Sequence, residues 1–536
     1  MAPAESFRVL DDQGRPITLV QAESGLKISG SSRQSTWKEC LGSCFQGSKS
    51  TCVPYRDILW SSVDANDKLV IDFVARPGTS VVEQRKWRAF DTSEGREPLE
   101  RLARSIQAIA YGPAQQQKKA MVLVNPSSGP GHAAKLWEKQ VKPLFSAARM
   151  HFDVVFLKKG GEATELMQHL DYKAYDTVIA CSGDGTPHEI FNGLAKRPDA
   201  GRALRKLAIA QVPCGSGNAM AINFYGSSKA AVAAIGIIKG VVTPVDLVSI
   251  TQGEDSNRYV SVLSQAVGII AESDLATEHL RWMGSKRFEV GLVMRIWKKQ
   301  CYPCDLAIKV EVADKEEIKR FYADNLDKAQ TPEVYDKMYD HEGLPELKYG
   351  TVNSAISSDW QQISTDKIGN FYCGNMVYMA PDAGFFPAAL PSDGCMDLVT
   401  INGDLSTVKG ANVLLSIESG NFYNSEHVSY QKISAYRITP RNQHDGYISI
   451  DGEKVPFEPF QCEIHQGLGR VLTRRGRYEA AGPKGWEKYA QDAAVAVEAP
   501  KGSAHRVAPM ESTSSINNGT SVSSDRQQSA SKVQAV

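Results

Sequence analysis

The chain has 536 residues and carries 61 basic and 61 acidic side chains, so its formal net charge at pH 7 is zero. A neutral chain has no long-range field that would attract nucleic acid, and a nucleic-acid partner is therefore not expected. Its 10 cysteines follow no regular spacing. In a chain long enough for two or three domains, this favours reduced thiols over a disulfide framework.

Residues 1–112 are predicted to form a small β-rich module of pleckstrin-like type. Alternating apolar segments such as Lys68–Val74 indicate strands, and the periodic run Leu99–Ile106 indicates a closing helix. Cys40 and Cys44 lie among aromatic and basic residues. They are candidates for S-palmitoylation, which would make the module membrane-targeting, and two buried thiols are the alternative. Neither a signal-like segment nor a membrane-length apolar run is present, so a cytoplasmic location is predicted.

Residues 118–239 contain three consecutive units of apolar strand, glycine-containing loop and helix. The strands Met121–Val124, Thr177–Cys181 and Leu207–Val212 run into the loops 125–131, 182–186 and 213–218. Loops at the carboxyl ends of parallel strands meet in one crevice of an open sheet. Backbone amides in glycine loops and at helix N-termini bind anions, so the crevice is predicted to hold a ligand with several phosphates. The helical stretch 229–238 closes this region.

The second loop places Asp184 between two glycines. A carboxylate has the wrong charge for a phosphate ligand, so Asp184 is predicted either to organise Mg²⁺ or to act as a base for an attacking hydroxyl. The following helix is predicted to start with Thr186 as N-cap and Pro187 at the first helical position. Glu189 would then complete a capping box, or it would belong to the site.

Two common nucleotide-binding motifs are not supported. Gly129-x-Gly131-x-x-Ala134 matches a relaxed dinucleotide fingerprint. However, the acid expected at the end of the second strand is missing, because Asp153 stands at the start of the strand 151–156. No glycine loop ends in Lys-Ser or Lys-Thr, which argues against a P-loop NTPase.

Strand-like alternation dominates from Val245 onward, for example in Leu247–Ile250 and Tyr259–Leu263. Cys301-x-x-Cys304 precedes the alternating run 305–312, so a strand is favoured there over a redox or zinc site. Residues 314–367 are rich in Lys, Glu and Asp and are predicted to be a surface insertion that could serve as a mobile regulatory loop. The Ser-, Gln- and Asn-rich tail 500–536 is predicted to be disordered.

Taken together, Asn125-Pro126 with its glycine loop, the run Ser182–Leu194 and the run Pro213–Ala219 resemble the catalytic domain shared by diacylglycerol kinases and sphingosine (long-chain-base) kinases. The segment Ala271–Leu275, followed by Arg281–Gly284 and Arg287-Phe288, is similar to sphingosine kinases of the fungal type. The resemblance runs from about residue 118 to 473. It implies an open Rossmann-like α/β nucleotide-binding domain over 118–239 and an antiparallel β-sandwich lipid-binding domain over 240–480.

The resemblance implies an ATP- and Mg²⁺-dependent kinase that phosphorylates the primary hydroxyl of sphingosine, dihydrosphingosine or phytosphingosine. Asp184 would be the general base, and Asp274 would bind the substrate's ammonium through a charge-assisted hydrogen bond. The positions that the resemblance assigns to the nucleotide are Asn125, Ser127, Ser182, Gly183, Gly185, Thr186, Glu189, Gly215, Ser216, Gly217, Asn218, Arg281, Arg287, Asp451, Gly452 and Glu453.

Several alternatives stay open at this stage. Arg281 could pair with Glu278 on a solvated helix, and Asp451-Gly452 could simply be a hairpin turn. The apolar stretch 288–297 would line a lipid-tail pocket or pack as ordinary core. Relatives usually carry a more basic first loop, whereas Pro130 removes a backbone donor, so weaker nucleotide binding is expected.

Two other functions remain as alternatives: a kinase for diacylglycerol or ceramide, against which Asp274 argues, and a catalytically silent lipid or nucleotide sensor. Peripheral contact with endomembranes or the plasma membrane is expected. A homodimer is left open.

Overall fold

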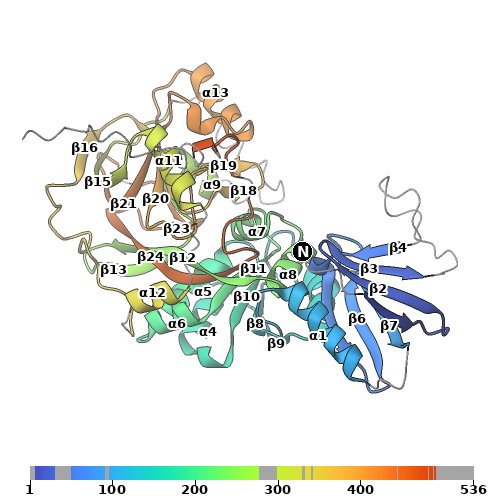
Figure 1. The fold of residues 1–536 in the computed structure, drawn as a ribbon. Coiled ribbons are helices and arrows are strands. Elements are labelled where there is room, and N and C mark those ends of the chain that lie inside the picture. Colours follow the sequence, from blue (N-terminus) through green and yellow to red (C-terminus); the bar gives the residue numbers. More distant parts are fainter. Residues whose placement is uncertain are drawn as a thin grey trace, which may run out of the picture. The chain divides into compact units, whose positions relative to one another are not determined.

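The computed structural model describes residues 6–30, 50–90, 96–276, 299–326, 328, 332–339, 342–443, 445–480, 482–486 and 488–489 (Figure 1). Some predictions lie outside these residues, namely those for Cys40, Cys44, Arg281, Arg287, the stretch 288–297 and the tail. Asp274 lies on a described helix, but its side chain is outside the described part.

The N-terminal region is a seven-stranded antiparallel sheet followed by one helix, as the sequence predicted. The helix α1 (Glu97–Tyr111) buries Leu99, Leu102 and Ile106 along one face. Its last residue, Tyr111, donates a hydrogen bond to the Leu59 carbonyl oxygen at 2.7 Å. The strands, in the sheet order β4-β3-β2-β1-β7-β6-β5, are β1 (Ser6–Leu10), β2 (Pro16–Ala22), β3 (Gly25–Gly30), β4 (Ser50–Val53), β5 (Ile58–Val63), β6 (Lys68–Val74) and β7 (Val82–Ala89).

The predicted α/β region is built on four parallel strands in the order β9-β8-β10-β11. They are β8 (Lys119–Val124), β9 (His151–Phe156), β10 (Thr177–Ser182) and β11 (Ala208–Pro213). The residues of β10 and β11 are buried throughout, which explains why these strands are continuous apolar runs. The helices are α2 (Ala133–Leu136), α3 (Lys142–Ala147), α4 (Glu162–His169), α5 (Gly185–Ala195), α6 (Ala200–Lys206), α7 (Ala219–Tyr225) and α8 (Ala230–Ile238).

The predicted start of α5 is wrong by two residues. The helix begins at Gly185, and Asp184 already has helical dihedral angles, so Thr186 lies inside the first turn and is not the N-cap. Glu189 does not complete a capping box on its own helix. Its Oε2 instead accepts a hydrogen bond from the Ala163 amide at 3.1 Å, at the start of α4. The glycines on both sides of Asp184 make room for neighbouring groups, since a Cβ on Gly185 would lie 2.6 Å from Glu453 Oε1 and one on Gly183 would lie 3.3 Å from the Gly215 Cα.

The C-terminal half is rich in antiparallel β structure. Its strands are β12 (Val241–Gln252), β13 (Asn257–Ser261), β14 (Ser264–Gly268), β15 (Cys304–Val312), β16 (Gln361–Thr365), β17 (Ile368–Gly374), β18 (Tyr378–Ala380), β19 (Ala383–Gly384), β20 (Met396–Asn402), β21 (Ser429–Pro440), β22 (Ile448–Ile450), β23 (Glu453–Val455) and β24 (Phe460–Thr473). Its helices are α9 (Ile269–Ala276), α11 (Lys315–Asn325), α12 (Pro332–Met338) and α13 (Thr407–Glu418). The strand β15 confirms the prediction made for the residues after Cys301.

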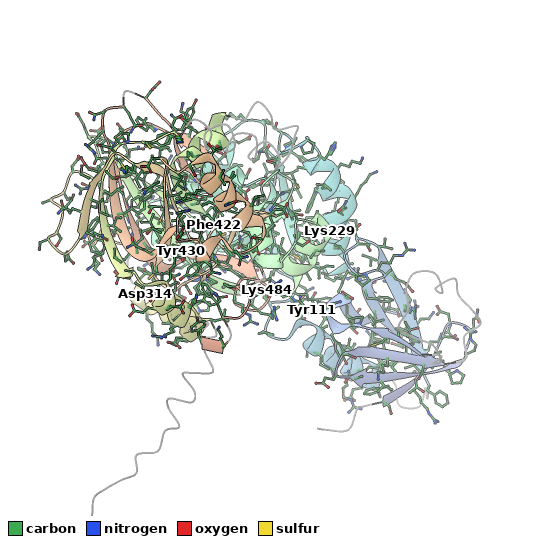
Figure 2. All side chains as sticks on the ribbon, turned by 90° about the horizontal axis from the view of Figure 1, so that it is seen from above. Tyr111, Lys229, Asp314, Phe422, Tyr430 and Lys484 are labelled. Atoms are coloured by element: carbon green, nitrogen blue, oxygen red, sulfur yellow. The ribbon has the colours of Figure 1, made fainter. Side chains whose placement is uncertain are left out.

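One long strand joins the two halves. β24 pairs antiparallel with β12 and β21, and it is also parallel to β11, where Ile209 lies opposite Val471. Hydrogen bonding between strands is therefore continuous from the α/β region into the β-rich half. Aromatic side chains fill part of the β-rich core, where Phe422 and Tyr430 are buried among the crowded side chains of Figure 2.

The segment 314–367 contains more structure than a mobile surface insertion would. It provides α11, α12 and β16, with Ile318 and Tyr335 fully buried. Tyr335 packs directly on Gly467, where a Cβ would lie only 2.5 Å from the ring. Single buried apolar residues on otherwise charged helices attach this segment to the core. The overall composition of the segment does not reveal them, because charged residues outnumber them. Among the described helices, none is by itself long and apolar enough to cross a membrane.

Candidate active site

The three glycine-containing loops meet as predicted. A Cβ on Gly215 would lie 2.4 Å from the Cα of Gly183, and a Cβ on Gly129 would lie 2.5 Å from the carbonyl oxygen of Cys214. The Gly183 amide also donates to Ser128 Oγ at 3.3 Å. Only glycine permits these backbones to approach so closely. The loops therefore form one continuous surface at the carboxyl ends of β8, β10 and β11.

This surface is one wall of a cavity of about 680 Å³. The opposite wall comes from the β-rich half and includes Leu263, Ser264, Tyr372 and Met379. The predicted residues that line the cavity are Asn125, Ser127, Gly183, Asp184, Gly185, Thr186, Glu189, Gly215, Ser216, Gly217, Asp451, Gly452 and Glu453. The fold thus brings predicted residues from four distant segments into one cavity.

Two residues that were predicted to contact the nucleotide instead make hydrogen bonds within the loops. Ser182 is fully buried and donates from Oγ to the Gly183 carbonyl oxygen at 2.8 Å. Asn218 accepts from the Gly215 amide at 2.8 Å and donates to the Gly215 carbonyl oxygen at 2.7 Å, which closes the third loop. Both residues therefore shape the loops, and neither lines the cavity.

Asp184 is half-buried in the cavity, next to Gly217 and the start of α7. Burial raises its pKa to about 6, although hydrogen bonds from Gln211 and from backbone amides at residues 218–220 act in the opposite direction. A carboxyl group that titrates near neutrality is suited to accepting a proton. Of the two roles left open by the sequence, this favours the general base.

Gln211 positions Asp184, and the sequence analysis missed it. Its side chain is fully buried, its Oε1 accepts from the Ala221 amide at 2.9 Å, and its Nε2 donates to Asp184 Oδ1 at 3.2 Å. The amide is held from one side so that it presents a donor to the carboxylate. The available signal was a single polar residue inside an otherwise apolar strand.

Two lysines at the cavity were also missed. Lys158 and Lys159 follow β9 and line the cavity together with Gly160. The Oε2 atom of Glu162 holds their turn by accepting from the Lys158 amide at 2.5 Å and from the Lys159 amide at 3.3 Å. A fourth loop thus brings basic residues to the cavity, although the ammonium of Lys159 also pairs with the Glu165 carboxylate at 3.0 Å.

The Asp451 carboxylate makes several hydrogen bonds within the protein. Its carboxylate accepts from Ser261 Oγ at 2.5 Å and from the amides of Val262, Leu263 and Ser264 at 2.8–3.1 Å. His188 Nδ1 lies 2.8 Å from Asp451 Oδ2. Burial is the largest single effect on the pKa of His188 and lowers it, but the hydrogen bond and charge of Asp451, together with the charges of Glu453 and Glu189, raise it by more in sum, so the net shift is upward. The pair ties α5 to the cavity wall 261–264.

The hairpin that was the alternative for Asp451-Gly452 is present. β22 and β23 pair with each other, and Asp451 and Gly452 connect them with φ of 52° and 87°. Both dihedral angles lie in the left-handed region that such a turn requires. The turn directs the Asp451 carboxylate inward, while Gly452 and Glu453 are exposed at the cavity.

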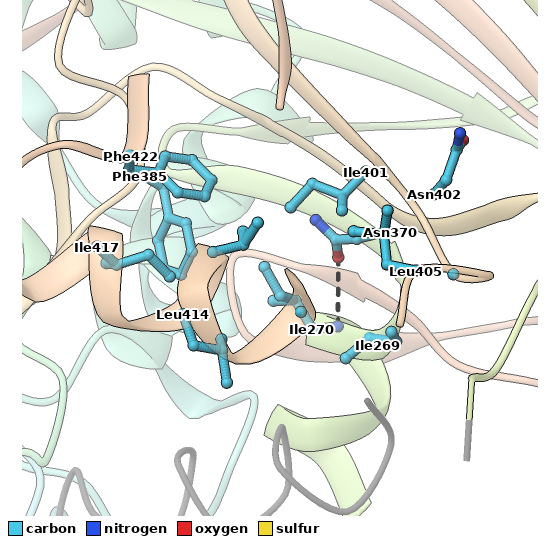
Figure 3. Close-up of a pocket in the computed structure, with 13 residues that line it drawn as sticks. Ile269, Ile270, Asn370, Phe385, Ile401, Asn402, Leu405, Leu414, Ile417 and Phe422 are labelled. Atoms are coloured by element: carbon cyan, nitrogen blue, oxygen red, sulfur yellow. Dashed lines mark hydrogen bonds between the residues drawn. The ribbon is translucent and has the colours of Figure 1, made fainter. Parts of the chain in front are cut away.

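A second, apolar cavity of about 50 Å³ adjoins the first (Figure 3). Ile270, Phe385, Leu414 and Ile417 line both cavities, so the polar cleft continues into apolar space. Asn370 accepts from the Ile270 amide at 3.3 Å and holds the start of α9 there. The stretch 288–297, for which a tail-pocket lining and ordinary core packing were both left open, lies outside the described part, and the contribution of α13 to an apolar cavity was not predicted.

Comparison with known proteins agrees with this arrangement. Residues 119–250 match the diacylglycerol kinase catalytic domain. The chain is 34% identical over 429 residues to sphingoid long chain base kinase 5 of Saccharomyces cerevisiae, covering 70% of this chain and 62% of that protein. It is 31% identical to sphingoid long chain base kinase 4 of Schizosaccharomyces pombe, covering 78% of this chain and 88% of that protein.

The chain belongs to the sphingoid long-chain-base kinase family. Sphingosine kinase 1 of Arabidopsis thaliana is more distant, at 29% identity over 66% of this chain and 75% of that protein. The match to the catalytic domain covers the three glycine-containing loops, Asp184 and Gln211. Asp451 lies beyond it, in the β-rich half that completes the cavity.

Proposed function

We propose that this protein transfers the γ-phosphoryl group of ATP to the primary hydroxyl of a sphingoid long-chain base. One observation carries the proposal: a carboxyl group whose pKa is raised to about 6 lies where a glycine-loop cleft opens into an apolar cavity. The cleft suits a polyphosphate, and its apolar end suits the part of a hydrocarbon tail next to the head group. The apolar cavity of about 50 Å³ has room for only a few methylene groups, so a longer tail would have to widen it or extend beyond it. Asp184 lines the cleft.

In the proposed reaction, Asp184 accepts the hydroxyl proton as the hydroxyl oxygen bonds to the γ-phosphorus. The bond from that phosphorus to the β–γ bridging oxygen breaks, and ADP leaves. Loop amides and the lysines at 158 and 159 stabilise the phosphate charge. Gln211 keeps the Asp184 carboxylate oriented toward the hydroxyl.

Mg²⁺ is proposed to accompany ATP, because it neutralises phosphate charge in this class of reaction. Among the described residues, no cluster of three or more His, Cys, Asp or Glu side chains is placed to hold a metal. The carboxylates of Asp184 and Glu453 face the cavity. One or two carboxylates together with substrate phosphates are a typical Mg²⁺ site, so the residues present fit this ion.

Asp274 is proposed to bind the substrate's ammonium group. It lies on α9, whose residues Ile270 and Ser273 line the main cavity. A carboxylate there would favour a free base over neutral lipids. Cytoplasmic location, peripheral contact with an endomembrane or the plasma membrane, and acylation of Cys40 and Cys44 are part of the same proposal, because the substrate is a membrane lipid.

The test is phosphate transfer from labelled ATP to dihydrosphingosine, phytosphingosine, ceramide and diacylglycerol in mixed micelles. Transfer is expected only to the free bases, and it should be lost in Asp184→Asn and strongly reduced in Asp274→Asn. Asp404→Asn is a matched control, because Asp404 pairs with Lys367 at 3.1 Å and lines neither cavity. Transfer to neutral lipids that survives Asp274→Asn would identify a different lipid kinase, and no transfer at all would favour a silent sensor.

A further inference from the structure

The helix α13 exposes two large apolar side chains on one face. Val408 is 71% exposed and Leu415 is 65% exposed, the highest values among the large hydrophobic residues that the structure describes. They are seven positions apart, and the exposed Ala411 lies between them on the same face. Lys409 is exposed beside this stripe. We call Val408, Ala411 and Leu415 the outer stripe.

The opposite face of α13 is also apolar. Gly410, Val413, Leu414 and Ile417 line the apolar cavity, and Figure 3 shows the side chains of Leu414 and Ile417 on this helix. Leu415 contacts both the solvent and the main cavity, because it is highly exposed and also lines that cavity. A surface helix usually keeps one face polar. On α13 the polar residues Lys409, Asn412 and Ser416 instead form a strip between two apolar faces, one toward the cavity and one toward the outside.

We propose that α13 docks on the surface of a bilayer, with the outer stripe in the apolar boundary of the leaflet. This deepens the proposed function and rests on it. A lipid tail that crosses water exposes each of its CH₂ groups at a cost in free energy. An opening that faces a membrane would let the tail enter without crossing water. Leu415, at one end of the outer stripe, borders the main cavity, which continues into the apolar cavity.

A bilayer fits this surface better than a second copy of the chain. Stable protein–protein interfaces bury about 800 Å² on each partner. The outer stripe is a single helix face with two large side chains, far below that size. Shallow insertion of one helix face is, by contrast, the usual geometry of an interfacial helix, and the exposed Lys409 suits the headgroup region.

The test compares binding to phosphatidylcholine vesicles with activity in detergent micelles. Val408→Ser is expected to weaken vesicle sedimentation about fivefold, and Val408→Ser/Leu415→Ser about 25-fold, because each change removes part of the inserted apolar surface. Val408 lines neither cavity. Val408→Ser should therefore keep its micellar activity while its apparent KM for vesicle-borne base rises about fivefold.

The matched control is Val334→Ser/Met338→Ser on α12, where the two side chains are 51% and 60% exposed. It should bind vesicles as the parent does. Unchanged vesicle binding in the α13 variants would overturn the docking proposal, as would an equal loss in the α12 control. So would a concentration-dependent dimer that Val408→Ser dissolves. A parent protein that binds vesicles but phosphorylates no base would refute the proposed function and leave docking supported.

Discussion

The two walls of the cavity are built in different ways. The nucleotide wall consists of backbone loops in direct contact, held by hydrogen bonds such as those between Asn218 and Gly215. The second wall comes from the β-rich half, which supplies Leu263 and Ser264 and also the lining of the apolar cavity; that lining consists mainly of side chains, several of them on α13, whose opposite face is exposed. The first wall holds charged and hydrogen-bonding groups in fixed positions, while the second provides apolar space and separates it from the outside. We therefore expect changes in the first wall to affect every acceptor and changes in the second to affect acceptors selectively.

The largest effect is expected at Asp184. Protonation of this carboxyl, whose pKa is about 6, should lower kcat/KM about tenfold at pH 5 relative to the plateau above pH 7. Asp184→Asn should reduce kcat about 10³-fold for every acceptor, because proton acceptance contributes about 10²- to 10⁴-fold. A pH profile that is flat between about pH 5 and 8 would contradict this role.

The same change should stabilise the fold. Burial raises the pKa of Asp184 from 3.8 to about 6, so ionisation destabilises the folded state. This cost is absent below pH 4, grows as pH rises through the interval between the two values, and is constant above it. Asp184→Asn should therefore increase the free energy of unfolding at pH 8 by about 1–3 kcal/mol. Denaturant titrations at both ends of the range measure the difference, which should vanish at the acid end.

A smaller but still general loss is expected for Gly215→Ala. A Cβ at this position would lie 2.4 Å from the Cα of Gly183, so the second and third loops must separate. We expect kcat/KM for ATP to fall about 100-fold, since misplacement by about 1 Å has that effect. Gly343→Ala is the matched control, because its nearest contact would be an ordinary 3.4 Å. Equal behaviour of the two variants in ATP kinetics would show that close contact of the loops is unnecessary.

The sequence predicted the first wall better than the second for a physical reason. Asp184 and its glycines lie in short motifs whose strand, turn and helix follow one another, so local rules placed them. Gln211 and the Asp451–His188 pair depend on contacts across the sheet, between residues 263 positions apart in the latter case. The apolar cavity is harder still, because Phe385 and Leu414 are ordinary core residue types whose role depends on the space left between them. The charged composition of the segment 314–367 likewise gave no indication that Tyr335 is buried.

The second wall should respond selectively. Leu414 lines both cavities at the point where they join, so Leu414→Phe would narrow the passage. KM for an 18-carbon base is expected to rise about tenfold, since one or two methylene groups are worth about 1–3 kcal/mol in an apolar pocket. Short-chain bases and ATP should keep their KM values. Chain-length series in micelles measure this, and an equal change for all chain lengths would show that Leu414 does not face the tail.

The smallest effect is expected at His188, which tests how firmly the two walls are joined. His188→Gln removes the charge opposite Asp451 and leaves a group that can still hydrogen-bond. The folded-state pKa of His188 is raised above 6.5, so its charge stabilises the fold below that value, and this stabilisation is lost as pH rises through the folded pKa. The variant should therefore be less stable than the parent by about 1 kcal/mol at pH 6 and nearly equal to it at pH 9. At pH 6, KM for ATP should rise a few-fold with kcat little changed, because the loop 261–264 moves while Asp184 stays in place directly before α5. Reduced stability with an unaltered KM would mean that the two walls hold their relative positions without this pair.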